Sequence, residues 1–546
     1  MRLYHRTYYY FLRSMFMLLS SVVIWGCSAP QVTQGLITIS ITVDKRDVQI
    51  KITSGSTVQE ALKKAQIILG EIDRVEPPSY TVVSDGSQVK VIRVREEYYI
   101  EQEVIPFEQQ ELRNEALPEG ERRLSQPGVN GLEEITFHRV FEDGIEVSNN
   151  IVKSVVLKAA IPEVLMIGSR SSFASINIPG NLAYLSAGNA WVIDNSTGNR
   201  HLLVSTGDLD GRIFSLSRDG KFLLFTRFSV TEKSINSLWA ASLQQDTVKL
   251  IDLSVNDIVH FAQFDPGSRI IAYSTVEWRE TAPGWQANND LYELSVSASG
   301  FVGPTKLDLE ANSGGVYGWW GMEFSWAPDA VRLLYSRPDG IGIIDLSDDK
   351  QEASILSIIP YQTGGNWAWV PGAAWSPDGN VIYTVDHSSS GSEGPEISTQ
   401  FDLIVIPLLG GSPVRLVNNV GMFAYPVPSP IQSRINFIST SSGKYIDQEA
   451  FSVAYLQAIF PDQSETSGYR LNIIDRDGSN QKTLFPEEGA VGLDPQHVVW
   501  SPGPMSPEGD YAIAFIYNGN IWMVDTTSGA SQQITGDGLT TRVDWR

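Results

Sequence analysis

Short apolar runs separated by turn residues dominate this chain of 546 residues. Residues 36–43 (LITISITV) and 48–53 (VQIKIT) alternate or run apolar, as two strands do when one face of their sheet is buried. Turn residues lie between them, from Asp44 to Asp47. Similar runs recur as far as the C-terminus, so the pattern predicts a mainly β protein.

One helix is expected beside the first strands, because the apolar positions of STVQEALKKAQIILG recur at helical spacing. Thr57 and Glu60 form a capping box at its start, and Gly70 is its expected end. Residues 36–94 are therefore predicted to form a small β-grasp unit. The pattern from TVQEAL through LGEIDRVEPP to SDGSQVKVIRV resembles the ubiquitin-like domain found beside cell-wall modules in bacterial surface proteins.

The next segment, residues 95–170, places five glycines among strand-like runs. Glycine weakens a strand, so its repeated use suggests backbone geometry that a side chain would forbid. The spacing resembles the G-five domain, a family of thin, mostly single-layer sheets in extracellular proteins that has been proposed to bind N-acetylglucosamine polymers. The resemblance implies a contact with peptidoglycan or another glycan, or else an elongated spacer. The five glycines are Gly120, Gly128, Gly131, Gly144 and Gly168.

The remaining two thirds of the chain repeats two short phrases. The first predicts a strand, a turn and a second strand, and it occurs as LSRDGKFLLFT, FDPGSRIIAYS, WAPDAVRLLYS, WSPDGNVIYTV, PSPIQSRINFIS and SPEGDYAIAFI. Each is followed by a second strand pair, such as NIWMVDTTSGASQQIT. Four strands per repeat, at periods of ~40 to 50 residues, are typical of propeller blades.

A further blade, NLAYLSAGNAWVIDNSTGNRHLLVS, has three strands and lacks the first. The missing strand is found in TRVDWR at the C-terminus, where Trp545 stands as Trp326, Trp375 and Trp500 stand in their blades. The C-terminal strand is therefore predicted to close a seven-bladed propeller over residues 175–546. These repeats resemble those of TolB-like, WD-type propellers.

Strand order also assigns the loops to the two faces of the propeller, with strands lettered a to d outward. The a–b and c–d turns are short and share one face. The other face carries the long b–c insertions EWRETAPGWQANND, HSSSGSEGPEISTQ and STSSGKYIDQEAFSVAYLQAIFPDQSETSG, and the d–a connections GGVYGWWGMEF, TGGNWAWVPG and NNVGMFAYPVP.

Aromatic residues gather in these loops beside Ser, Gly and Asn, a composition that suits a binding surface for sugar or peptide. The alternative is that the rings pack between blades. The ligand-binding residues predicted at this mouth of the channel are Trp285, Trp319, Trp320, Trp367, Trp369, Phe423 and Tyr425.

The formal net charge of the chain is −23, and this value narrows the possible partners. Nucleic-acid binding needs clustered Lys and Arg, so the acidic balance argues against it. It argues equally against electrostatic adsorption to anionic lipid.

The only cysteine, Cys27, follows a segment typical of a secretory signal. Arginines near the start precede an apolar run of about a dozen residues, which is too short to span ~30 Å of hydrocarbon as a helix. Ile24-Trp25-Gly26-Cys27 resembles the bacterial lipobox, although Trp25 departs from its usual small residue. The resemblance implies removal of residues 1–26, a lipid on the Cys27 sulfur, and a linker over residues 27–35. The alternative is an incidental cysteine in a signal that is cleaved elsewhere.

Catalytic chemistry is harder to find in the sequence. The six histidines lack ligand spacing, and neither H-E-x-x-H nor G-x-S-x-G occurs. The run Asp475 to Asn480 is similar to a calcium loop but lacks its downstream glutamate, so a structural turn is expected. We therefore expect no catalytic residue, no metal and no cofactor.

The sequence predicts a binding or scaffold protein, lipid-anchored on the extracytoplasmic face of a bacterial membrane. Its expected partners are the membrane, peptidoglycan or another glycan, and other envelope proteins. A propeller hydrolase or lyase acting on wall polysaccharide is the alternative, because the sequence does not give the separation of paired carboxyl groups.

Overall fold

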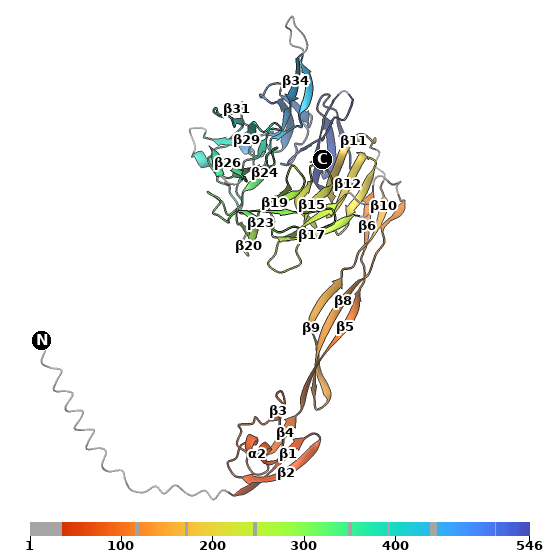
Figure 1. Cartoon of the computed structure of the whole chain (residues 1–546), viewed down its shortest axis with the longest axis vertical. Helices are drawn as coiled ribbons and strands as arrows, with labels where there is room; N and C mark the ends of the chain where they lie inside the picture. The colour runs from red at the N-terminus through yellow and green to blue at the C-terminus, as the bar shows by residue number, and fades with distance from the viewer. Residues whose placement is uncertain are drawn as a thin grey trace, which may run out of the picture. The chain divides into compact units, whose positions relative to one another are not determined.

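The computed structural model describes residues 35–546, apart from 115–116, 118–119, 170–172, 244–247, 348–351, 390–393, 437–444 and 508. The chain folds as two compact units (Figure 1). The first contains residues up to Pro106 together with Asn130–Ala160. The second contains Phe107–Val129 and Ile161–Arg546. Apart from α2 and two single-turn 3-10 helices, the regular elements that are described are strands.

The first unit begins with the expected β-grasp sheet. Its four strands are β1 (Leu36–Val43), β2 (Arg46–Thr53), β3 (Arg74–Glu76) and β4 (Gln88–Ile92), in the order β2-β1-β4-β3. The helix α2 (Val58–Lys64) buries Val58, Ala61 and Leu62 against this sheet. β1 pairs with β2 in antiparallel and with β4 in parallel orientation.

The capping box at the start of α2 is present, because Glu60 accepts from the Thr57 N–H at 2.9 Å and Thr57 accepts from the Glu60 N–H. The predicted end at Gly70 is wrong. The helix ends at Lys64, and Gln66 then takes the left-handed conformation at φ 58°. Gly70 instead donates its N–H to Asp73 at 2.8 Å, as part of the following loop.

A three-stranded sheet completes the first unit. It consists of β5 (Val94–Ile105), β8 (Gly131–Glu142) and β9 (Ile145–Lys158), in the order β5-β8-β9. Most of its residues are exposed or half-buried, as expected for a single layer. Arg93 ties the sheet to the β-grasp fold, because its guanidinium binds Asp44 at 3.0 Å and Asp73 at 2.6 Å.

Two of the predicted glycines have clear backbone roles in this sheet. Gly144 makes the β8–β9 turn with φ 84°, which side chains rarely adopt. A Cβ on Gly131 would lie 2.5 Å from the Lys158 carbonyl oxygen, so only glycine fits this approach of two strands.

The second unit opens with a small sheet of β6 (Gln109–Asn114), β7 (Arg122–Gln126) and β10 (Glu163–Gly168), in the order β6-β10-β7. Gly168 and Gly120 lie at one end of it, where the Gly120 N–H donates to the Gly168 carbonyl at 3.0 Å. Gly128 lies against the Phe107 ring with no room for a Cβ.

Seven four-stranded blades follow, and the strands of each are named here from the innermost to the outermost. The first contains β42 (Thr540–Trp545), β11 (Asn177–Ser186), β12 (Asn189–Ser196) and β13 (Arg200–Val204). The second contains β14 (Leu209–Leu216), β15 (Phe222–Phe228), β16 (Asn236–Ser242) and β17 (Lys249–Asn256). The third contains β18 (Ala262–Phe264), β19 (Ile270–Tyr273), β22 (Leu291–Ser295) and β23 (Lys306–Leu309).

The fourth blade contains β24 (Glu323–Trp326), β25 (Arg332–Arg337), β26 (Gly340–Asp345) and β27 (Glu352–Ser357). The fifth contains β28 (Ala373–Trp375), β29 (Val381–Ser388), β30 (Gln400–Pro407) and β31 (Val414–Val417). The sixth contains β32 (Val427–Pro428), β35 (Ser452–Ala458), β36 (Tyr469–Asp475) and β37 (Lys482–Phe485). The seventh contains β38 (Val499–Trp500), β39 (Ala512–Tyr517), β40 (Asn520–Asp525) and β41 (Ser531–Gln533).

The C-terminal strand β42 is the inner strand of the first blade, as the sequence predicts. It pairs in antiparallel orientation with β11, with Trp545 opposite Leu182 and Asp544 opposite Ala183. The fold is thus mainly β, with a ubiquitin-like β-grasp, an elongated β segment and a seven-bladed propeller.

Two hairpins interrupt the blades, and one of them corrects the sequence analysis. The hairpin of β20 (Val276–Trp278) and β21 (Trp285–Ala287) lies between strands b and c of the third blade, as expected. The hairpin of β33 (Gln432–Asn436) and β34 (Tyr445–Ala450) lies between strands a and b of the sixth blade. β33 is therefore not the b strand that the sequence predicted here, because β35 takes that position by pairing with β32 and β36.

Candidate functional site

Trp369 is a wrong assignment among the aromatic residues predicted at the mouth of the channel. Its side chain is only 1% exposed and belongs to the core shared by the fourth, fifth and sixth blades. The indole Nε1 donates to the Met422 carbonyl at 2.8 Å, and the ring packs 5.0 Å from that of Phe401. Trp369 therefore packs between blades, as in the alternative interpretation, because apolar side chains surround its ring and its one polar atom is hydrogen-bonded.

The other six predicted aromatics are half-buried and lie in two groups. In the first, the ring of Trp320 lies 5.3 Å from Trp285 and 6.0 Å from Trp319. In the second, the ring of Phe423 lies 6.1 Å from Trp367 and 5.9 Å from Tyr425. Of these six, only Tyr425 lines the cavity described next.

The propeller surrounds a central cavity of about 670 Å³, lined by the seven inner strands and the segments leading into them. Six of the seven blades place a polar or charged side chain near the start of the inner strand. The fifth contributes the small residues Ala373 and Ala374 instead. We call the six side chains the polar ring: Arg542, Arg212, His260, Glu323, Tyr425 and His497, from the first, second, third, fourth, sixth and seventh blades.

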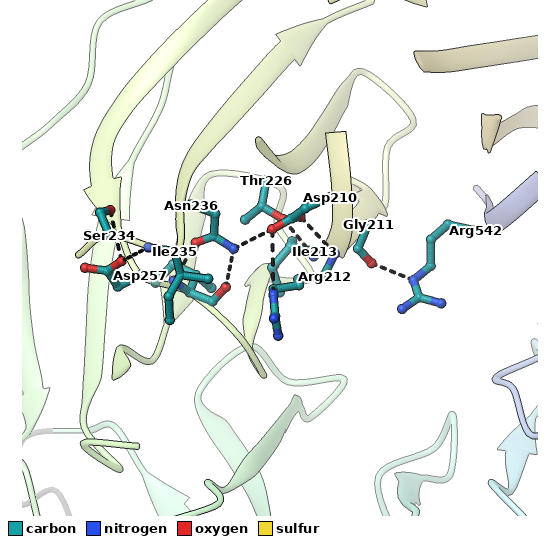
Figure 2. A network of polar contacts seen from close by, with 11 residues as sticks. Asp210, Gly211, Arg212, Ile213, Thr226, Ser234, Ile235, Asn236, Asp257 and Arg542 are labelled. Carbon is teal, nitrogen blue, oxygen red and sulfur yellow. Dashed lines mark hydrogen bonds and ion pairs between the residues drawn. The ribbon is translucent and has the colours of Figure 1, made fainter. Parts of the chain in front are cut away.

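Arg212, on β14, is held on two sides. Its guanidinium lies 4.8 Å from the centroid of the Trp285 ring, in a cation–π contact. Its Nε lies 3.8 Å from Oδ2 of Asp210, whose side chain is buried beneath it. Asp210 also accepts from the Asn236 amide at 2.7 Å and from the Thr226 hydroxyl (Figure 2).

Asn236 connects this network to the next blade. Its amide nitrogen also donates to the Ile258 carbonyl at 2.7 Å, and its oxygen accepts from the Ile258 N–H at 2.8 Å. Ile258 lies two residues before His260. The same network therefore fixes the position of Arg212 and of the segment that carries His260.

Arg542, on β42, extends to the neighbouring inner strand. Its Nε donates to the Gly211 carbonyl at 2.6 Å, as Figure 2 shows, and Nη1 contacts the Thr541 carbonyl at 3.2 Å. Burial in the channel lowers the pKa of Arg542, and the charge of Asp210 partly offsets this shift. Gly211 directly precedes Arg212, so the two guanidinium groups are anchored one residue apart.

Glu323 is the first residue of β24. Burial raises the pKa of Glu323 from 4.5 to about 7. Burial also raises the pKa of Tyr425, and the nearby charge of Glu323 adds to that shift. Tyr425 has a left-handed backbone at φ 42°, a conformation that costs free energy for an aromatic residue and is often found at binding sites.

The two histidines of the ring are held in the neutral form. The His260 ring lies 6.0 Å from Trp285 and 5.5 Å from Trp320. Burial lowers its pKa from 6.5 to about 4, and the charge of Arg212 contributes. The His497 ring lies 4.3 Å from Tyr425 and its accessible surface faces the channel. Desolvation by the surrounding residues lowers the pKa of His497 from 6.5 to about 4, with a contribution from the charge of Arg542.

Asp544 is the other carboxylate that lines the cavity, and its oxygens are already engaged. One accepts from the Leu216 N–H at 2.7 Å, and the other accepts from the Trp545 N–H at 2.9 Å and lies 3.5 Å from Arg546. These contacts hold Asp544 in a structural role. Glu323 is therefore the better candidate for a carboxyl group that meets a ligand.

Of the six side chains of the polar ring, the sequence analysis named only Tyr425. Arg212 and Arg542 occur in DGRIF and TTRVDWR, and the position of both on inner strands is the signal that could have identified them. Of the predicted aromatics, Tyr425 belongs to the ring, whereas Trp285 and Trp320 pack against His260 and Trp285 also contacts Arg212.

The described residues contain no group of three or more His, Cys, Asp or Glu that could hold a metal ion. At the expected turn, Asp477 accepts from the Ser479 N–H at 3.0 Å, and Asp475 accepts from the Asn480 amide at 2.7 Å. No helix in the described part of the chain is long and apolar enough to cross a membrane. Cys27 lies outside the described residues.

Two family models match the N-terminal part of the chain. The model described as "G5 domain" matches residues 96–170, and the model described as "G5-linked-Ubiquitin-like domain" matches residues 39–79. The chain therefore contains both domains, and the five predicted glycines lie within the G5 match.

Two resuscitation-promoting factors are among the similar curated proteins. The chain is 25% identical over 145 residues to Rpf2 of Corynebacterium glutamicum, covering 27% of this chain and 38% of the relative. It is 25% identical over 142 residues to RpfB of Mycolicibacterium smegmatis, covering 25% of this chain and 39% of the relative. The matches thus span less than two fifths of either relative.

Solved structures with similar parts include a propeller and a G5 domain. A putative TolB from Agrobacterium tumefaciens is 18% identical, with a TM-score of 0.33, over 61% of this chain and 95% of that one. The HP0197-G5 structure is 21% identical, with a TM-score of 0.13, over 14% of this chain and 99% of that one. The periplasmic gluconolactonase PpgL of Pseudomonas aeruginosa is 11% identical, with a TM-score of 0.39, over 66% of this chain and 98% of that one.

The G5 domain and the similarity to resuscitation-promoting factors indicate an extracellular protein associated with the cell wall. This conclusion agrees with the expected location outside the cytoplasm.

Proposed function

We propose that this chain is a cell-wall-associated binding protein whose propeller captures a ligand at the polar ring. The observation that carries the proposal is the arrangement of that ring, in which six blades direct a polar or charged side chain into one cavity of about 670 Å³. Concave sites with a few convergent polar groups are typical of ligand binding.

The G5 domain supplies a second contact in this proposal, with cell-wall glycan. Tyr98, on β5, is 64% exposed and stacks on His138 at 4.7 Å, while Tyr99 stacks on Phe137 at 4.9 Å. Arg139 covers the Tyr99 ring at 4.2 Å. The exposed Tyr98 ring on this strand suits contact with a sugar ring, whereas a pure spacer has no need of it.

A lipid at Cys27 would hold the protein at the outer face of a membrane, and along the chain the ubiquitin-like and G5 domains separate Cys27 from the propeller. The lipobox resemblance supports this part of the proposal. If it holds, Cys27→Ala releases the protein from the membrane fraction or leaves a larger precursor. Unchanged size together with retained lipid labelling would contradict the anchor.

The test of the binding role is a pull-down of the soluble full chain on purified peptidoglycan and on whole envelope fractions. One variant, Tyr98→Ala with Tyr99→Ala, alters the aromatic side chains on both faces of the G5 strand β5, and another, Trp319→Ala with Trp320→Ala, alters the mouth of the channel. Phe301→Ala is the matched control, because this 67% exposed aromatic lies on a c–d turn of the opposite face. Full retention of both double variants, with unchanged thermal melts, would exclude the proposed surfaces.

A hydrolase or lyase acting on wall polysaccharide is the second candidate, and Glu323 is the observation that favours it. A carboxyl group with a pKa of about 7 can act as a general acid or base near neutral pH. Incubation of the protein with purified wall polysaccharide distinguishes the two functions. Release of new reducing ends by wild type and not by Glu323→Gln would indicate the enzyme.

A further inference from the structure

We infer that the polar ring recognises a carboxylate, held between the guanidinium groups of Arg212 and Arg542. The inference rests on the proposed binding role of the channel and specifies the chemistry of its ligand. Three arginines line the central cavity of a chain whose net charge is −23, and of these Arg546 is paired with Asp544, which leaves Arg212 and Arg542. Their placement there concentrates positive charge at a site where an anion would meet it.

Arg542 is oriented so that part of its guanidinium remains available. Its Nε is engaged by the Gly211 carbonyl at 2.6 Å, and Nη1 has a longer contact of 3.2 Å to Thr541. Both of these acceptors are neutral backbone carbonyls. The positive charge of Arg542 therefore has no carboxylate within ion-pair distance among the described residues.

Arg212 is positioned by groups that lie behind it. Asp210 is the nearest carboxylate, at 3.8 Å, and its side chain is buried beneath the arginine, outside the cavity lining. The oxygens of Asp210 also accept from Thr226 and Asn236. The carboxylate thus fixes the arginine through its Nε side, and Trp285 fixes the plane of the guanidinium. Nη2 of Arg542 and the terminal nitrogens of Arg212 are thus left for a ligand, and together they suit contact with the two oxygens of a carboxylate.

The rest of the ring favours a carboxylate over a phosphate. His260 and His497 are neutral near pH 7 and add no positive charge. Glu323 lines the same cavity and repels a second negative charge when it is ionised. A carboxylate carries a single negative charge, whereas a phosphate carries up to two near neutral pH. The ring therefore matches a monoanion whose remaining, uncharged part extends toward Glu323 and Tyr425.

Such a carboxylate can come from a peptide with a free C-terminus or from an acidic sugar. Two matched probe pairs distinguish these sources: N-acetyl-alanyl-alanine with its carboxamide, and glucuronic acid with glucuronamide. Inorganic phosphate serves as the third arm. Binding to the full chain is measured by ligand-observed NMR at fixed ionic strength, because salt screens such contacts.

The expected result is binding of at least one acid, with about a tenfold loss for its uncharged amide. Arg542→Gln and Arg212→Gln each reduce the binding of that acid by a similar factor. Arg332→Gln is the matched control, because Arg332 also pairs with a carboxylate, Asp329 at 2.7 Å, and covers an indole ring, Trp375 at 5.1 Å, but does not line the cavity. This control is expected to bind as the wild type does.

Three outcomes would overturn the inference: equal binding of acid and amide, tighter binding of phosphate than of either acid, or unchanged binding by both arginine variants. If an arginine variant does not fold, the comparison of acid with amide on the wild-type protein still tests whether the site recognises a carboxylate. Failure of the carboxylate inference is separable from failure of the proposed function. In the first case the wild-type chain is still retained on envelope fractions through the mouth of the channel, and in the second it is not.

Discussion

The indole Nε1 of Trp545 donates a hydrogen bond of 2.7 Å to the carbonyl oxygen of Pro179, 366 residues earlier in the chain. The equivalent tryptophans of other blades make a different link. Trp375 donates to Ser325 at 3.1 Å, and Trp500 donates to Val427 at 2.8 Å, each on the inner strand of the preceding blade. Trp545 instead fixes the start of β11 within its own blade. The last residues of the chain thereby hold the first strand of the propeller.

Replacing Trp545 by Ala is therefore expected to destabilise the propeller by about 3–5 kcal/mol, as for other large buried aromatics. The side chain is fully buried, and its loss would leave a cavity and an unpaired Pro179 carbonyl. Urea unfolding measures the change. Trp278→Ala is the control, because this indole is 39% exposed on the β20–β21 hairpin. Equal stability of the two variants would show that the terminal strand is dispensable for closure.

The closure could be predicted from sequence because the repeat shows which strand a blade lacks. The sixth blade could not be assigned correctly in the same way, because RINFIS and SVAYLQA both read as strands after one turn. Only the pairing of Val427 with Ala454 shows that β35 is the b strand. Local pattern gives the presence of a strand, but the register of the blade depends on contacts between distant segments.

The candidate site also depends on contacts between distant segments, which the local sequence pattern does not give. Aromatic composition could not distinguish Trp369, which is buried in the core, from Trp320, which packs on His260. The contact between Arg542 and Gly211 joins residues 331 positions apart and depends on closure of the whole propeller. Similarly, α2 ends at Lys64 and Gln66 takes the left-handed conformation, although Ile67 and Leu69 still pack against the same core and continue the apolar pattern.

Glu323→Gln is expected to stabilise the propeller at pH 8 and to leave its stability unchanged at pH 4. Burial raises the pKa of Glu323 from 4.5 to about 7, so the folded state holds this proton more tightly than the unfolded state. The stability that results is fully present below pH 4.5 and is lost as the pH rises through 7. Because the side chain partly faces the cavity, we expect a gain of about 2 kcal/mol at pH 8.

Urea unfolding of both proteins at pH 4 and pH 8 measures this effect. Glu352→Gln provides a control, since this exposed glutamate lies on the outer strand β27. A stability difference between wild type and Glu323→Gln that does not change with pH would contradict the raised pKa.

His260→Asn is expected to have the opposite pH dependence. Burial lowers the pKa of His260 from 6.5 to about 4, so the unfolded state binds the proton more tightly. The stabilising contribution of the neutral ring is present above pH 6.5 and is lost as the pH falls toward 4. Removing the histidine therefore flattens the stability profile between pH 6.5 and 4 by roughly 1 kcal/mol per pH unit.

The measurement is a series of thermal or urea unfolding curves across that range. His201→Asn is a suitable control, because His201 is exposed on β13. Parallel profiles for wild type and His260→Asn would show that His260 titrates normally in the folded protein.

The last prediction concerns Met166, on β10 of the G5 domain. It is 6% exposed and belongs to the same apolar core as Leu182, Trp191 and Trp545 of the first blade. The adjoining β7 strengthens this link, because Gln126 accepts from the Ser205 hydroxyl at 3.0 Å. This part of the G5 domain and the first blade thus share one core. Met166→Ala is expected to destabilise both together, by about 2–5 kcal/mol.

Hydrogen exchange distinguishes this shared core from two independent folding units. In Met166→Ala the amides of β11 and β42 should lose protection along with those of β6 and β10, since cooperative units open together. The control is Val156→Ala. The Val156 side chain, on β9, is 57% exposed, so this variant should leave the amide protection of the propeller unchanged. If only β6 and β10 lose protection, the G5 sheet opens independently of the propeller. Loss in all four strands would mean that a force or ligand that disturbs the G5 sheet also reaches the strand that carries Arg542.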